Sequence, residues 1–507
     1  MNSPAQLYAR RLGIDTYQEN VAYMRADCKV CRSEGFGTRA RIELQCGARR
    51  IVATLNVVHS NLLAEDEIGL SETAWMALGV LPGQPVEVAH PAPLLSFSAV
   101  RAKIFGRPLS ADAASSIVTD ICAGRYSDIE MAAFITACSG SRLDLAESVA
   151  LTRAMTAAGQ RLQWDAPVVV DKHCVGGLPG NRTTLLVVPI VAACGLVIPK
   201  TSSRAITSPA GSADVMETLA PVALDIAGIR AVVEREGGCI AWGGAVSLSP
   251  ADDLLIRVER PLGLDSEGML VASVLSKKLA AGSTHVLIDI PVGRTAKVRS
   301  RETATLLSNR LKRVGHELGL MVDTVVTDGD QPVGRGIGPA LEAHDVLAVL
   351  QGDPLAPADL RQRSLMLAGL VLEMGGKAAA GQGLAMATQA LESGAAWLKF
   401  QAICDAQGGM RVPPRASFTH VVPTPHSGRI AAIDNRHMAT LAKLAGAPAA
   451  PAAGIYLHVR LDSRVAAGEP LLTLHAESPG ELAYAVAFAQ SQEHLVTIEQ
   501  GASYFFA

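Results

Sequence analysis

Residues 171–184, which read DKHCVGGLPGNRTT, bring a lysine, a histidine and three glycines into one short segment. The segment follows an apolar run at 168–170 and precedes another that begins at residue 185. Glycine lets the backbone approach another group closely, and a helix start offers unpaired N–H groups with a positive dipole. Lys172 adds a charge, and Thr183 and Thr184 add hydroxyl donors. These features predict an anion site that suits phosphate, although a plain strand-to-helix turn would use the same glycines.

Two common nucleotide-binding signatures are missing from this segment. It lacks the GK[ST] ending of a P-loop, and its glycines do not follow the GxGxxG spacing. The sequence therefore gives no sign of nucleotide hydrolysis or dinucleotide binding here.

A second donor-rich segment, PKTSSRAITSPAGS, occupies residues 199–212. It contains Lys200, Arg204 and six hydroxyl residues. Arginine and hydroxyl groups beside a helix start are a usual means of holding an anion. We expect this segment to share one site with residues 171–184, and a solvated Ser/Thr loop is the alternative.

A third segment, at 264–278, carries a carboxyl group and two lysines. Ser273 and Lys277 are four residues apart, so they share one face of a predicted helix. Asp265 is a candidate general acid, because a carboxyl group near a substrate can donate a proton when its pKa is raised. It is equally suited to be the N-cap of that helix.

From residue 166 onward, predicted β-strands and α-helices alternate, and these elements must position the three segments. Short apolar strands separated by helical runs predict an α/β fold with a parallel sheet, and such sheets bind ligands at the carboxyl ends of their strands. The rest of the chain predicts further domains, with a linker at about 408–425. The expected division is an N-terminal β-rich domain at 1–92, a helical domain at 97–160, the α/β domain at 161–410 and a small, mostly-β domain at 420–507.

Composition excludes several classes of protein. The 507 residues carry a formal charge of −3 and only 4% aromatic side chains, which argues against a nucleic-acid-binding protein. The N-terminus lacks the apolar core of a signal peptide, and the longest apolar run, 185–198, is too short to cross a bilayer. We therefore expect a soluble, cytoplasmic protein without membrane association.

The nine cysteines are scattered, as in a cytosolic enzyme with reduced thiols. Cys28 and Cys31 have half of a zinc-site spacing but no second pair, so we interpret them as buried thiols and expect no metal site.

Taken together, the three segments resemble the thymidine phosphorylase family of nucleoside phosphorylases. Residues 172–177 resemble its KHSxGG signature, and QPVGRGIG at 331–338 resembles its QPxGxxxG turn. The resemblance covers roughly 97–490 and includes the small C-terminal β domain. The sequence motifs DKHxVGGxPGNxTT and SSRAITSPAG are most similar to those of a long branch of the family. That branch includes archaeal AMP phosphorylases and bacterial members regarded as thymidine phosphorylases. That branch has an additional N-terminal domain, which residues 1 to about 90 would supply.

The resemblance implies a helical domain against an α/β domain, usually in a homodimer, with the site in the cleft. The implied reaction is reversible phosphorolysis, in which phosphate attacks C1′ of a nucleoside and the base leaves. Neither a metal nor an organic cofactor is needed, and inorganic phosphate is a co-substrate. Small-molecule nucleosides or nucleotides are the expected partners.

The resemblance also assigns site residues. Positions that match phosphate contacts are Lys172, Thr184, Ser202 and Ser212. Positions that match nucleoside or nucleotide contacts are Gly177, Ser203, Arg204, Ala205, Ile206, Thr207, Ser208, Ser212, Ser273 and Lys297. The implied catalytic residues are Asp265 as proton donor, with His173 and Lys277 near the base. This set suits an oxocarbenium-like transition state, which needs a placed phosphate and a proton or cation at the departing base.

Two departures from the family pattern affect this assignment. Cys174 replaces the signature serine, and a thiol donates a weaker hydrogen bond to phosphate than a hydroxyl does. The pyrimidine-branch arginine upstream of Asp265 has no counterpart, because Arg257 and Arg260 are out of register.

Four functions remain open from the sequence. The sequence supports a thymidine phosphorylase and a nucleoside 5′-monophosphate phosphorylase almost equally. The second enzyme would use Lys200, Arg204 and the Ser/Thr segment to bind the additional phosphate. A phosphoribosyltransferase of the same fold would need a magnesium site, for which only Asp252 and Asp253 are candidates, and these are expected to begin a helix. A non-catalytic binding protein is the fourth.

Overall fold

The computed structural model describes residues 5–205, 208–264, 266–492 and 494–500. The chain separates into two compact units. Residues 1–143 with 254–264 form the first unit, and 144–253 with 265–507 form the second. The two units divide the chain differently from the four predicted domains, because residues 144–160 of the predicted helical domain belong to the second unit and residues 254–264 of the predicted α/β domain belong to the first.

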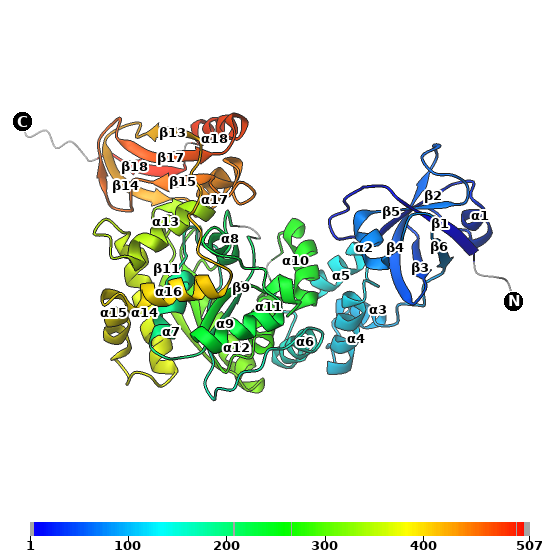
Figure 1. The fold of residues 1–507 in the computed structure, drawn as a ribbon, viewed down its shortest axis with the longest axis horizontal. Coiled ribbons are helices and arrows are strands. Elements are labelled where there is room, and N and C mark those ends of the chain that lie inside the picture. The colour runs from blue at the N-terminus through cyan, green and yellow to red at the C-terminus, as the bar shows by residue number, and fades with distance from the viewer. Residues whose placement is uncertain (1–4, 206–207, 265, 493, 501–507) are drawn as a thin grey trace, which may run out of the picture. The chain divides into compact units, whose positions relative to one another are not determined.

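The N-terminal β-rich region is a closed barrel of six strands in the order β1-β5-β2-β4-β3-β6 (Figure 1). Alternating apolar side chains such as Leu44, Leu55 and Ile68 fill it and are fully buried, which confirms the strands predicted there. Cys28 and Cys31 belong to this core as buried, free thiols, as expected. The elements are β1 (Ala5–Arg11), β2 (Val21–Arg25), α1 (Lys29–Glu34), β3 (Arg41–Cys46), β4 (Arg49–Val58), β5 (Glu67–Leu70), α2 (Glu72–Leu78) and β6 (Pro85–Ala89).

Four helices follow the barrel, in agreement with the helical region predicted between 97 and 160. They are α3 (Phe97–Ile104), α4 (Ala111–Cys122), α5 (Asp128–Cys138) and α6 (Leu145–Ala157). α5 and α6 both begin with capping boxes, in which Ser127 or Asp144 accepts an N–H bond from a glutamate three residues on. α6 belongs to the second unit.

The central sheet of the second unit is parallel, as the β/α alternation predicts. β10 (His285–Val292) pairs with β11 (Met321–Asp328) on one side and with β7 (Val170–Cys174) on the other. β8 (Ile198–Ser202) pairs with β9 (Gly238–Trp242), and a parallel bridge between Val169 and Val197 joins the two sets of strands. The strand order is therefore β11-β10-β7-β8-β9, which brings the ends of β7 and β8 to one edge.

One expectation about this sheet is wrong in its detail. The strand expected at 168–170 continues through Asp171–Cys174, whose backbone pairs with β10 up to Asp289. Lys172 and His173 therefore lie on a strand rather than in a loop, because backbone pairing with β10 extends the strand through these polar residues. Successive side chains of β7 consequently point to opposite faces of the sheet.

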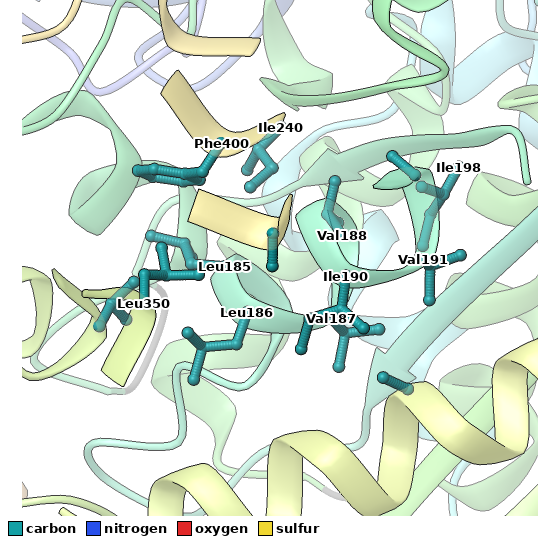
Figure 2. Close-up of a cluster of buried hydrophobic side chains, with 14 of the residues drawn as sticks. Leu185, Leu186, Val187, Val188, Ile190, Val191, Ile198, Ile240, Leu350 and Phe400 are labelled. Atoms are coloured by element: carbon teal, nitrogen blue, oxygen red, sulfur yellow. The ribbon is translucent and has the colours of Figure 1, made fainter. Parts of the chain in front are cut away.

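The helix after the first donor-rich segment is α7 (Thr184–Ala193), which is apolar on every side. A helix without a polar face is stable only inside a core. Figure 2 shows its side chains, including Leu185, Val188 and Val191, within a cluster that also contains Ile240 and Phe400. Full burial of each such side chain contributes about 1.5–3 kcal/mol, so α7 is held firmly at the sheet.

The remaining elements of this region surround the sheet or connect its strands. They are α8 (Ser212–Glu217), α9 (Ile226–Glu236), a short 3₁₀ helix (Gly243–Val246), α10 (Pro250–Leu262), α11 (Glu267–Ala280), α12 (Arg301–Glu317), α13 (Pro339–Leu350), α14 (Ala358–Met374), α15 (Gly383–Glu392) and α16 (Ala395–Ala406). Asp252 and Asp253 lie in the first turn of α10, as expected.

The C-terminal region is mostly β, with a four-stranded sheet β12-β15-β17-β13 and a three-stranded sheet β16-β14-β18. The predicted linker at 408–425 is wrong over 418–423, because these residues form β13 and pair with β17. Its elements are β12 (Gly336–Ile337), β13 (Phe418–Pro423), β14 (Gly428–Ile433), α17 (Asn435–Leu444), β15 (Gly454–Leu457), β16 (Arg464–Val465), β17 (Pro470–Ala476), α18 (Pro479–Ser491) and β18 (Val496–Glu499). Among the described residues, no helix is long and apolar enough to cross a membrane.

Candidate active site

The ammonium group of Lys172 lies at the start of α7, as the anion-site prediction requires. Its Nζ donates to Thr183 Oγ1 at 2.6 Å and lies 3.9 Å from Asp289 Oδ2 on β10. Thr183 in turn donates to Asn181 Oδ1 at 3.2 Å. Lys172 and Asp289 are both almost completely buried. A charged lysine is therefore fixed beneath the first turn of α7, where the helix dipole also favours an anion.

The glycines of the first segment have different neighbours. Gly177 has φ +80°, and a Cβ there would lie 2.5 Å from the backbone nitrogen of Lys297. Gly180 has φ +72°, and its Cβ would lie 2.2 Å from the carbonyl oxygen of Val333. Gly176 has φ +90° and open space where a Cβ would stand. Gly177 and Gly180 thus serve the approach of the protein's own backbone, and Gly176 is the one with room for a ligand.

Asp214 organises the second donor-rich segment. Its Oδ2 accepts N–H bonds from Ala205 at 2.6 Å and from Gly211 at 2.8 Å, which closes the loop before α8. Arg204 pairs with Asp214 at 3.3 Å, donates to Glu217 Oε1 at 2.9 Å and stacks over Trp242 at 4.7 Å. The positive charge of Arg204 is therefore balanced by two carboxylates of the same loop and helix.

Asp171 binds two lysines inside the sheet edge. Its carboxylate lies 3.3 Å from Lys200 Nζ on β8 and 2.7 Å from Lys278 Nζ on α11. All three side chains are buried. Burial, opposed by the attraction of Asp171, lowers the pKa of Lys278 to about 7. The contact fixes α11 and β8 against β7, so all three predicted segments meet at one place.

His173 is surrounded by positive charge. Burial and the lysines at 278, 200, 277 and 172 lower the pKa of the imidazole well below its usual range. His173 is therefore neutral at pH 7, so it can exchange a hydrogen bond with a base but cannot act as a cation.

Lys277 and Ser273 lie on α11, as the helical spacing predicts. Lys277 Nζ lies 2.5 Å from Asp252 Oδ2. Burial lowers the pKa of Lys277, but the carboxylate of Asp252 more than reverses this and the pKa is raised. Lys277 therefore remains charged, and Ser276 donates to the carbonyl of Ser273 at 3.3 Å.

The other predicted residues lie along the same edge. Thr184 is the first residue of α7, Ser202 is the last of β8 and Ser212 is the first of α8. Ser203 and Ser208 lie in the loop between them, and Ser208 donates to the carbonyl of Ala210 at 2.8 Å. The predicted residues Ile206, Thr207 and Asp265 lie outside the described residues, although Ser266 is the N-cap of α11.

Several residues of this site were not predicted from the sequence. Asp171 and Lys278 adjoin predicted residues in DKH and SKK, and this adjacency was the only signal for them. Asp289, Arg182 and Glu342 gave no signal, because their importance depends on contacts across the fold. Among the residues that the structure describes, no three His, Cys, Asp or Glu side chains are placed to hold a metal ion.

Comparisons with known families agree with this arrangement. Residues 166–397 match the α/β domain of a glycosyl transferase family, and residues 98–159 match the helical bundle domain of the same family. Residues 429–495 match a pyrimidine nucleoside phosphorylase C-terminal domain.

Relatives cover nearly the whole chain. A protein of Acidovorax sp. (strain JS42) named "Putative thymidine phosphorylase 2" is 65% identical over 98% of this chain and 96% of its own length. A "Putative thymidine phosphorylase" of Polaromonas sp. (strain JS666 / ATCC BAA-500) is 63% identical over 99% of this chain and 98% of its own length. The crystal structure of anthranilate phosphoribosyltransferase from Thermus thermophilus shares the fold, with a TM-score of 0.51 and 22% identity over 61% of this chain and 99% of that chain. The chain belongs to the thymidine phosphorylase family of nucleoside phosphorylases, and it is a pentosyl-transferring enzyme.

Proposed function

We propose that this enzyme catalyses the reversible phosphorolysis of thymidine to thymine and 2-deoxyribose 1-phosphate. The buried charges at the site support a phosphate co-substrate. Lys172 Nζ lies 3.9 Å from Asp289 Oδ2, a wider separation than those of Lys278 and Lys200 from Asp171, so its charge is the least compensated of the three buried lysines. An uncompensated buried cation is costly, so a phosphate dianion is a favourable occupant.

The observation that carries the choice of a nucleoside over a nucleotide is the pairing of Lys200 and Arg204. Both were candidates for a second phosphate pocket. Lys200 is buried against Asp171, and Arg204 is paired with Asp214 and Glu217. A 5′-phosphate would have to displace these carboxylates or lie beside them, whereas a neutral 5′-hydroxyl would not. The names of the two relatives support the same substrate.

In the proposed mechanism, Lys172, Thr184, Ser202 and Ser212 place phosphate beneath C1′ of the nucleoside. The C1′–N1 bond breaks through an oxocarbenium-like state, and a phosphate oxygen forms the new bond to C1′. The electron pair of the broken bond goes to the base, which takes up a proton. The charged Lys277 stabilises the departing base, neutral His173 exchanges a hydrogen bond with it, and Asp265 supplies the proton.

The proposal includes three further features. The reaction needs no metal or organic cofactor, and inorganic phosphate is its co-substrate. The enzyme is a homodimer or a higher homo-oligomer and acts in the cytoplasm. Its only partners are the nucleoside and phosphate.

The test is release of the base from thymidine, uridine, AMP, CMP and UMP, with and without phosphate, followed by chromatography. We expect phosphate-dependent release of thymine from thymidine and none from the monophosphates. Release from the monophosphates alone would show that the 203–208 loop holds a 5′-phosphate, and it would refute the nucleoside assignment. Release of no base would refute phosphorolysis of these substrates.

A further inference from the structure

Arg182 connects the two donor-rich segments, and the resemblance to the family gives it no role. It lies two residues before α7, and its side chain is almost fully buried. Its Nη1 donates to Ser212 Oγ at 3.2 Å, and its Nη2 donates to the carbonyl of Ala210 at 3.0 Å. A single guanidinium group therefore binds both the hydroxyl and the backbone at the start of α8.

The direction of the bond to Ser212 determines what that hydroxyl can do. A serine hydroxyl has one donor and two acceptor positions. Because Ser212 accepts from Arg182, its own O–H remains free to donate to a phosphate oxygen. Thr183 differs, because it accepts from Lys172 and donates to Asn181, so its proton is already used. A bond from a cation also polarises the hydroxyl and strengthens its donation.

Glu342 holds Arg182 from the opposite side. The carboxylate of Glu342, in the first turn of α13, forms an ion pair with Arg182 Nε. It also accepts the backbone N–H of Gly338 at 3.1 Å and is 1% exposed. All three edges of the guanidinium group are therefore engaged. This planar fork fixes the distance between the start of α7 and the start of α8 in a way that a lysine cannot reproduce.

We propose that Arg182 is a positioning residue that orients the Ser212 hydroxyl as a donor to the attacking phosphate, with Glu342 holding the guanidinium group in place. This inference rests on the proposed function, because it assumes that phosphate binds between α7 and α8. It adds that the affinity of this site for phosphate depends on a residue that does not itself contact the ligand.

The test is a double-mutant cycle with inorganic phosphate as the probe. Its dissociation constant is measured by calorimetry for the wild type, Arg182→Lys, Ser212→Ala and the double variant. Loss of a charge-assisted bond should weaken phosphate binding by about tenfold in Arg182→Lys. If Arg182 acts through Ser212, the double variant should bind phosphate as weakly as Ser212→Ala alone. Arg182→Lys should also raise the KM for phosphate while the KM for thymidine changes less than about twofold.

Arg41→Lys is the matched control. In the first unit, Arg41 donates to Thr54 Oγ1 at 2.9 Å and to the carbonyl of Gly124 at 2.8 Å, which reproduces the bonds of Arg182. It should cost stability without changing phosphate affinity. If Arg182→Lys does not fold, Glu342→Gln tests the same idea at pH 8, where the wild-type Glu342 is ionised, since it should weaken phosphate binding only while Ser212 is present.

Each outcome has a defined meaning. Unchanged phosphate affinity in Arg182→Lys, or effects of the two substitutions that multiply, would overturn the inference. A wild type that binds phosphate but releases no base would refute the proposed function. The double-mutant cycle would then still test whether Arg182 orients Ser212, because it measures phosphate affinity alone. A wild type that does not bind phosphate would overturn both.

Discussion

Replacing Asp171 by asparagine removes the negative charge that Lys200 and Lys278 share and keeps the shape of the side chain. Asp171 is 0% exposed, and the two ammonium groups lie 3.3 Å and 2.7 Å from its carboxylate. At an effective dielectric constant of about 20, these separations correspond to about 5 and about 6 kcal/mol of attraction. The net loss is smaller, because the variant no longer desolvates a carboxylate. Removal of one partner from a buried pair usually costs about 3–5 kcal/mol.

The loss of stability should depend on pH in a defined direction. The pKa of Lys278 in the native state is lowered to about 7. Between that pH and the usual lysine pKa, the native state binds fewer protons than the unfolded state. The Lys278 contribution to wild-type stability therefore rises with pH over this range. Without Asp171 the pKa of Lys278 falls further. Below pH 7 the wild type therefore retains a proton that the variant releases. Asp171→Asn should cost about 3–5 kcal/mol at pH 6, and at least about 1 kcal/mol less at pH 9.

Urea unfolding of both proteins at pH 6 and pH 9 measures this difference. Glu392→Gln is the control, because Glu392 also accepts a close bond, from Arg361 at 2.6 Å, but the two side chains are 61% and 37% exposed. That variant should lose less than about 1 kcal/mol at either pH. A loss for Asp171→Asn that is equal at both pH values, or no greater than that of the control, would refute the argument that Lys278 is a buried, pKa-shifted partner.

Two further predictions follow from Gly177 and Glu342. Gly177→Ala should cost more than the about 1–2 kcal/mol of a left-handed alanine and should raise the KM for thymidine, because its Cβ would lie 2.5 Å from the backbone of Lys297. Gly83→Ala, at φ +75° with open space, should show the backbone cost alone, and equal unfolding midpoints would contradict the clash. Burial raises the pKa of Glu342 to about 7, so wild-type stability should fall as pH rises from about 4.5 to 7. Glu342→Gln should reduce the difference between the free energies of unfolding at pH 5 and pH 8 by about 3 kcal/mol. An unchanged difference would show that Glu342 does not titrate in this range.

Much of the fold follows from local sequence. The β-rich N-terminal domain follows from the alternation of residues such as Ile42 and Leu44, although its closure into a barrel was not predicted. The parallel sheet follows from short apolar strands between helices. The errors occurred where pairing overrides composition. Lys172 and His173 lie on β7 because β10 pairs with them, and residues 418–423 form β13 because β17 pairs with them. Polar or proline-rich residues can join a strand when a neighbour supplies the hydrogen bonds.

The residue types at the site were determined by the sequence alone, because glycines, hydroxyls and lysines at helix starts have chemistry that does not depend on distant contacts. From them came the prediction of an anion site, the family and the expectation that these segments share one site. Only the tertiary structure decided which charges remain available. Lys200 and Arg204 are paired with carboxylates, His173 is neutral among lysines, and Arg182 spans two loops. Charge pairing and pKa depend on distances of a few ångströms between residues remote in the chain, and only the folded backbone sets those distances.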